Sequence, residues 1–110
     1  SSANWTLTTS GRAGHSSTVF SAGSGYGAIY EMARILDTFR RDLPEANLTY
    51  NVGLVAGGTP ATLADNAESA SALGKTNIIA DSAVARGDLR TLTAEQDARI
   101  RTAMQAIVDA

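Results

Sequence analysis

The sequence contains a single imidazole, a side chain that often takes part directly in catalysis. His15, the only histidine, lies in the glycine- and serine-rich stretch SGRAGHSS, residues 10–17. An imidazole can bind a metal, transfer a proton or donate a hydrogen bond to an oxyanion. A zinc site needs further ligands, and the chain has no second histidine and no cysteine, so His15 has no partners for such a site. Two interpretations stay open: a hydrogen-bond donor projecting from the end of a strand, or an exposed loop residue without a role.

Two further polar residues flank a strand-like segment near the end of the chain. Asn77 lies in GKTNIIA, and Arg90 closes GDLR thirteen positions later. A guanidinium can hold a carboxylate through two parallel hydrogen bonds. The alternatives are a turn residue at Asn77 and a solvated strand end at Arg90, in a surface network with Asp88 and Arg86 that would contribute little stability.

The glycines of GSGYG, residues 23–27, do not form a dinucleotide-binding motif. Such a motif has the spacing GxGxxG in the turn directly between a strand and a helix. Here the spacing is GxGxG, and the first glycine lies well past the end of the predicted strand. We expect these glycines to give the backbone freedom before a helix.

The first half of the chain predicts a strand followed by a helix. Trp5 and Leu7 alternate with polar residues, which predicts a strand that ends near Arg12. Apolar residues then recur at intervals of three and four over about 26–41, which predicts a helix that stops before Pro44. Its apolar stripe is broad enough to cover both a sheet and a partner and comprises Ala28, Ile29, Met32, Ala33, Ile35, Leu36 and Phe39.

The second half predicts two more strands and a second helix. Alternation over 48–56 and again in the segment up to Arg90 indicates strands. Between them, the alanine-rich segment 61–73 has no clear period, so a short helix and a β-hairpin are both possible, and the hairpin is favoured. A capping box from Thr93 to Gln96 begins the last helix.

This order of elements indicates the α+β class. Helices that return to one face of a mainly antiparallel sheet form a sandwich, and βαββα lacks one strand of the ferredoxin-like βαββαβ unit. We therefore expect a ferredoxin-like fold, a truncated last strand that would follow Ala110, and an extra hairpin-like insertion around 57–75. With 110 residues, the chain is expected to be a single domain, 1–110.

Composition excludes several classes of partner. Nine Lys and Arg against eleven Asp and Glu give a net charge of −2, and the basic residues are scattered, so no nucleic-acid-binding stripe is predicted. No apolar run approaches the roughly 18 residues that would span a bilayer, so no membrane association is predicted. We expect a soluble chain, and composition does not indicate its compartment.

Taken together, SGRAGHSS, the helix GAIYEMARILDTFR and the segment GKTNIIADSAVARGDLR resemble a known family. They are similar to the lid, or dimerisation, domain of the zinc exopeptidase superfamily that includes glutamate carboxypeptidase, acetylornithine deacetylase and succinyl-diaminopimelate desuccinylase. The resemblance extends from about Trp5 to Val108. It implies that the chain is excised from a larger two-domain metallopeptidase whose two zinc ions lie in a separate catalytic domain.

The resemblance also implies roles for three residues. His15 would reach across a homodimer and stabilise the carbonyl oxygen during hydrolysis of a peptide or N-acyl amino acid. Asn77 would contact the substrate, and Arg90 would hold its carboxylate. The homodimer would form through the first helix and an edge strand.

Two features depart from the family pattern. Ala80 stands where many relatives have proline, and the segment from Gly57 to Lys75 is longer than in compact members. The alternative function is a stand-alone ferredoxin-like module that binds a small regulatory ligand and oligomerises through its sheet edge. A purely structural dimerisation domain, in which His15 has no role, is a third interpretation.

Overall fold

The computed structural model describes residues 2–21, 23 and 25–110. Three long strands, β1 (Ser2–Ser10), β2 (Thr49–Gly58) and β5 (Ser82–Arg90), and two helices, α1 (Ala28–Asp42) and α2 (Ala94–Asp109), form the body of the domain. The remaining elements are short: the 3₁₀ helix η1 (Ser16–Thr18) and the strands β3 (Ala61–Leu63) and β4 (Ala70–Ala72).

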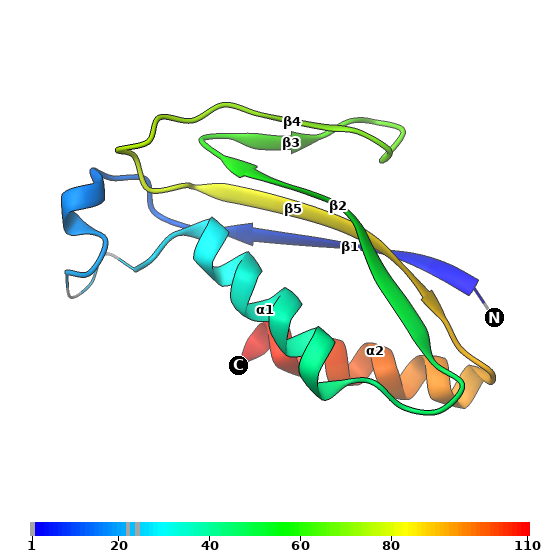
Figure 1. The fold of residues 1–110 in the computed structure, drawn as a ribbon. Coiled ribbons are helices and arrows are strands. Elements are labelled where there is room, and N and C mark those ends of the chain that lie inside the picture. The colour runs from blue at the N-terminus through cyan, green and yellow to red at the C-terminus, as the bar shows by residue number, and fades with distance from the viewer. Residues whose placement is uncertain (1, 22, 24) are drawn as a thin grey trace.

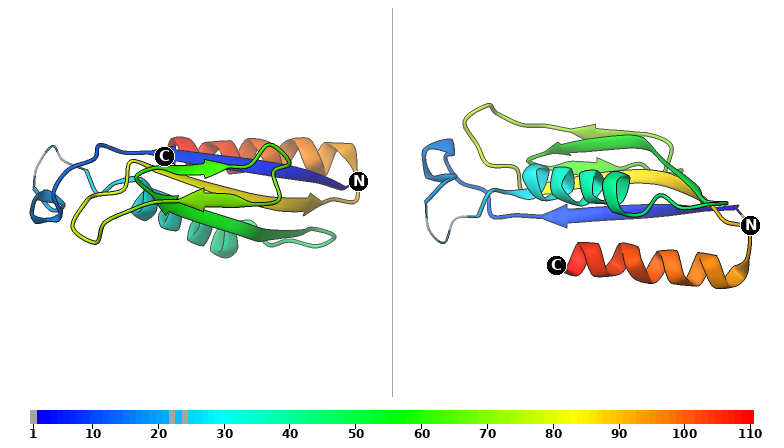
Figure 2. Two further views of the ribbon diagram at one scale, coloured as in Figure 1. Left: turned by 90° about the horizontal axis from the view of Figure 1, so that it is seen from above. Right: turned by 60° about the horizontal axis from the view of Figure 1, so that its bottom comes forward.

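The long strands form an antiparallel sheet in the order β1-β5-β2, and both helices lie on one face of it (Figures 1 and 2). Arg90 pairs with Ser2 and Thr49 at one end of the sheet, and Ser82 pairs with Ser10 and Gly58 at the other. This arrangement confirms the predicted ferredoxin-like α+β fold. We call the two ends the Arg90 end and the His15 end, since the loop with His15 follows Ser10.

The hydrophobic core lies between the sheet and the helices. The Trp5 and Phe39 rings pack edge-to-face at a centroid distance of 6.0 Å. Small residues in β5, Ala83 and Ala85, leave room for the helices. The buried members from the strands are Trp5, Leu7, Ala83, Ala85 and Leu89, and those from the helices are Ala28, Met32, Ile35, Phe39, Ile100 and Met104.

The broad apolar stripe of α1 divides into two parts. Ala28, Met32, Ile35 and Phe39 are buried against the sheet. Ile29 remains 49% exposed, Ala33 is also exposed, and Leu36 is half-buried beside the core. One side of the helix therefore stabilises the domain, and the other leaves apolar surface next to β2.

The segment 61–73 is a hairpin, as favoured from the sequence. β3 and β4 pair antiparallel and lie across the face of the sheet opposite the helices (Figures 1 and 2). Val84, on the hairpin side of β5, is buried. The Arg86 guanidinium donates hydrogen bonds to the Ala67 carbonyl at 3.3 Å and to Thr6 Oγ1 at 2.7 Å. The hairpin thus covers the sheet and is tied to it by a side chain of the central strand.

The ends of the helices are fixed by polar contacts. Thr93 Oγ1 accepts the Gln96 N–H at 3.0 Å, which confirms half of the predicted capping box, while Gln96 Oε1 accepts the N–H of Leu92 at 2.8 Å. The Arg99 guanidinium donates two hydrogen bonds to the Glu45 carboxylate. These contacts hold the loop after α1 against the start of α2.

Candidate functional site

His15 is held by its own loop. It is exposed and forms the N-cap of η1, where its Nδ1 accepts the backbone N–H of Ser17 at 3.0 Å and lies 2.9 Å from Ser17 Oγ. Because a backbone N–H can only donate, Nδ1 acts as the acceptor, and a neutral ring then carries its proton on Nε2. The described hydrogen bonds of the His15 side chain all involve Nδ1, so Nε2–H of this exposed residue is available as a donor.

Asn77 lies next to His15 at the His15 end of the sheet. An isolated antiparallel bridge joins His15 and Ile78, and the Ser16 N–H donates to the Asn77 carbonyl at 2.8 Å. The Ile79 N–H donates to the Gly14 carbonyl at 2.7 Å on the other side of the bridge. Backbone hydrogen bonds therefore bring two of the three predicted site residues together, and Asn77 is exposed beside the imidazole loop.

The loop that carries His15 is anchored where it leaves β1. The Gly11 N–H donates to the Asp81 carbonyl at 2.9 Å. A Cβ at Gly11 would lie 2.8 Å from the backbone nitrogen of Ala28, so only glycine allows this loop to pass so close to the start of α1. The His15 loop is thus supported by the residue that precedes β5 and by the start of α1.

Arg90 lies at the opposite end of the sheet. It is the last residue of β5, and its Nε is 3.5 Å from Asp88 Oδ2 in an exposed ion pair. The strand from Ser82 to Arg90 alone spans roughly 26 Å at the usual rise of a β-strand, and Asn77 precedes it by five residues. The structure therefore brings His15 and Asn77 together and leaves Arg90 far from both, so one chain cannot offer all three residues to one small substrate.

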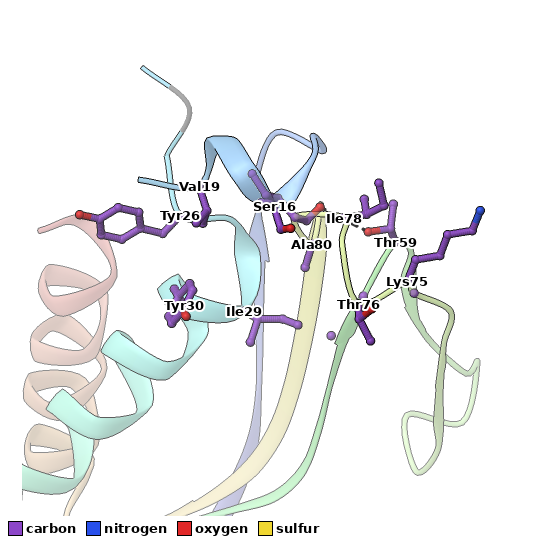
Figure 3. A pocket seen from close by; sticks show the side chains of 14 residues that line it. Ser16, Val19, Tyr26, Ile29, Tyr30, Thr59, Lys75, Thr76, Ile78 and Ala80 are labelled. Atoms are coloured by element: carbon purple, nitrogen blue, oxygen red, sulfur yellow. Dashed lines mark hydrogen bonds between the residues drawn. The ribbon is translucent and has the colours of Figure 1, made fainter. Parts of the chain in front are cut away.

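A cleft of about 400 Å³ lies at the His15 end, between the start of α1 and the base of the hairpin (Figure 3). Val19, Tyr26, Ile29 and Tyr30 line one side of it, and Thr59 and Thr76 line the other. Ser16 and Ile78, the residues that follow His15 and Asn77, also border the cleft. Periodicity alone did not predict this cleft, although Tyr26 and Tyr30, four positions apart at the start of a predicted helix, were a usable signal.

Apolar surface continues from this cleft along α1 and β2. Ile29 and Gly57 line both the cleft and a second groove of about 370 Å³, which also contains Ala33, Leu36 and Val55. Val55 is 55% exposed. β2 is at an edge of the sheet, so its outer backbone groups are open to pairing. We call this surface the α1/β2 face.

Two kinds of feature are absent from the described residues. Across 2–21, 23 and 25–110, no three His, Cys, Asp or Glu side chains are grouped so that they could hold a metal ion. Within the same residues, neither helix is long and apolar enough to cross a membrane. Gly27, the last glycine of GSGYG, is the N-cap of α1, which agrees with the role at the helix entry expected for these glycines. Ser24 of the same segment lies outside the described residues.

The fold and the exposed His15 loop define the class of this chain: a ferredoxin-like α+β domain with one apolar edge. Residues 1–110 match the family described as peptidase dimerisation domain, so the chain belongs to that family. This confirms the resemblance stated from the motifs. Among curated proteins, no sequence matches the chain.

Solved structures show the same fold at low sequence identity. The aminobenzoyl-glutamate utilization protein of Klebsiella pneumoniae has a TM-score of 0.72 and 17% identity over 98% of this chain and 24% of its own. A tripeptidase of Staphylococcus aureus has a TM-score of 0.71 and 19% identity over 97% of this chain and 24% of its own. A hydantoinase/carbamoylase family amidase of Burkholderia multivorans has a TM-score of 0.70 and 15% identity over 98% of this chain and 23% of its own. The chain therefore spans about a quarter of the length of these relatives.

Proposed function

We propose that this chain is the dimerisation and lid domain of a larger metallo-exopeptidase or amidohydrolase, and that it pairs with a second copy through the α1/β2 face. The family match and the exposed apolar residues of that face support the pairing. The rest of the parent would be a catalytic domain, because the similar tripeptidase and amidase are about four times as long as this chain. Those two names also support peptide or N-acyl amino acid amides as the substrate class.

The geometry of such a pair follows from symmetry. A two-fold axis that brings together both β2 edges and both α1 helices keeps all helices on one face, so the two β2 strands must run antiparallel. The His15 end of one chain then lies beside the Arg90 end of its partner. A composite site would combine His15 and Asn77 of one chain with the partner's Arg90.

Each residue has a distinct part in the proposed hydrolysis. The Nε2–H of His15 would donate to the carbonyl oxygen of the scissile amide as negative charge develops there, and the Asn77 side chain would add a polar contact. The partner's Arg90 would hold the substrate carboxylate through its guanidinium. A free Nε2 on an imidazole that is fixed at Nδ1 is the observation that carries this proposal.

The described residues of the chain do not fit a metal site, since His15 has no grouped ligands around it. The two zinc ions that the family resemblance implies would therefore be held by the catalytic domain. The contribution of this chain is to orient the substrate and to stabilise developing charge.

The test is the rate of the full-length parent carrying His15→Ala. We expect kcat to fall by more than about tenfold, which corresponds to about 1.4 kcal/mol of lost transition-state stabilisation. Ser17→Ala is the matched control, because it keeps the backbone N–H that fixes Nδ1 and should change kcat by less than about threefold. A fall of less than tenfold in the His15 variant would contradict the oxyanion role.

A further inference from the structure

The cleft at the His15 end has features of a binding site that the three predicted residues do not use. Tyr26 and Tyr30 line it and form an edge-to-face series with Phe20, with centroid distances of 5.6 and 6.1 Å, yet each of the three residues is more than half exposed. Exposed aromatic side chains that gather around a hollow commonly mark a ligand or partner site.

The lining of the cleft indicates the chemistry of its ligand. Among the described residues that line it, none is acidic, and the one charged residue, Lys75, extends its side chain away from the hollow (Figure 3). Ser16 and Thr76 provide hydroxyl groups at its border, whereas Val19, Ile29 and Ile79 make its surface apolar. Such a lining suits an uncharged aromatic or branched aliphatic group and gives a cation no counter-charge.

The position of the cleft relates it to the proposed composite site. Ser16 and Ile78 are the chain neighbours of His15 and Asn77, so the cleft begins within a residue of both. In the two-fold pair, this end of the chain lies beside the partner's Arg90. A substrate that contacts His15 therefore has the cleft next to its scissile bond.

We propose that the cleft is a specificity subsite that accepts an uncharged aromatic or branched aliphatic group of the substrate. This inference rests on the proposed function. A volume of about 400 Å³ is near the lower limit for small-molecule pockets, about 300 Å³, so the cleft holds one side chain or acyl group. The base of the hairpin forms one wall through Thr59 and Gly74, which gives the insertion at 57–75 a role in substrate choice.

The inference is tested by NMR titration of the 110-residue chain with N-acetyl-L-phenylalanine amide. We expect saturable shifts of the Ile29, Thr76 and Ile79 amides with a Kd on the order of 1 mM. Tyr26→Ala should raise that Kd by about fivefold, because one aromatic contact is lost. Leu92→Ala is the matched control, since Leu92 is an exposed apolar residue at the Arg90 end of the domain and should leave the Kd unchanged.

Three results would overturn the subsite. The first is an absence of saturable shifts, and the second is equal binding of N-acetyl-L-lysine amide. The third is loss of probe binding as the chain dimerises, which would make the cleft a contact between copies. The titration needs neither catalysis nor a partner, so its failure leaves the proposed function standing, and failure of the His15→Ala test does not change the titration.

Discussion

At the scale of single residues, local sequence explains how His15 is held but not what lies beside it. Ser17 is two positions away, so its N–H can reach Nδ1 within one turn of η1. Asn77 is sixty-two positions from His15 and is brought beside it by the bridge between His15 and Ile78. No periodicity encodes such a contact. Residue type drew attention to His15 and Asn77, but the family resemblance alone implied that they act in one site. Their roles stay predictions, as does that of Arg90.

Glu45 is the residue whose titration the structure predicts most directly. Hydrogen bonds from Arg99 and then from Gln96 lower the pKa of its carboxyl from 4.5 to about 2. A carboxyl whose pKa is lower in the folded state stabilises the fold above its unfolded pKa. This stabilisation should therefore be lost as the pH falls from about 4.5 towards 2.

NMR titration of the Glu45 carboxyl carbon checks this value. Arg99→Met should move the pKa of Glu45 upward, because the largest cause of the shift is removed. Arg101→Met is the control, since Arg101 pairs with Asp97 and should leave Glu45 unaffected. A wild-type midpoint near 4.5 would show that the ion pair does not form in solution.

At the scale of elements, hydrophobic periodicity predicted the three long strands and the first helix because each buries one face, and a capping box predicted the start of the second helix. Pro44 predicted where α1 ends, because the residue before a proline is disfavoured in a helix. Periodicity did not predict that the hairpin would fold over the sheet. Small residues such as Ala61 and Ala70 fit either face, and the tie from Arg86 to Ala67 depends on tertiary contacts.

Gly87 shows how one element depends on another. A Cβ at this position in β5 would overlap the Trp5 ring and the Asn51 carbonyl oxygen. Gly87→Ala should therefore lower the free energy of unfolding by about 1–3 kcal/mol, as overpacking of a core usually does. Denaturant unfolding measures the change.

Gly53→Ala is the matched control in the neighbouring strand. The nearest atom to its added Cβ is Asn51 Nδ2 at 3.9 Å, so the free energy of unfolding should change by less than about 0.5 kcal/mol. If Gly87→Ala and Gly53→Ala lowered the free energy of unfolding equally, the contact with Trp5 would not be what constrains Gly87.

At the scale of the whole molecule, the domain has two ends that carry the predicted site residues and one apolar side. His15 and Asn77 lie at one end, Arg90 lies at the other, and the α1/β2 face joins them along the side. Sequence analysis indicated the broad stripe of α1 but not which part of it stays exposed, because the sheet covers Met32 together with Ala28, Ile35 and Phe39.

Val55→Asp should abolish the proposed pairing without unfolding the chain. Val55 is 55% exposed in one chain, so a carboxylate there stays solvated in the monomer and becomes desolvated against a partner. Sedimentation velocity should show a monomer at concentrations where the wild type is dimeric. Leu92→Asp is the control, because Leu92 is exposed and lies away from the α1/β2 face, and this variant should sediment as the wild type does. If the Val55→Asp variant still forms a dimer, the interface lies elsewhere.

The central claim is that each site takes His15 from one chain and Arg90 from the other. It is tested by the activity of mixed dimers of the full-length parent, formed from one chain with His15→Ala and one with Arg90→Ala. Each hybrid should have one intact site, so random pairing of two inactive variants should restore about a quarter of the wild-type rate. If His15 and Arg90 acted from the same chain on one site, every hybrid site would be defective, and mixing that restores no activity would contradict the claim.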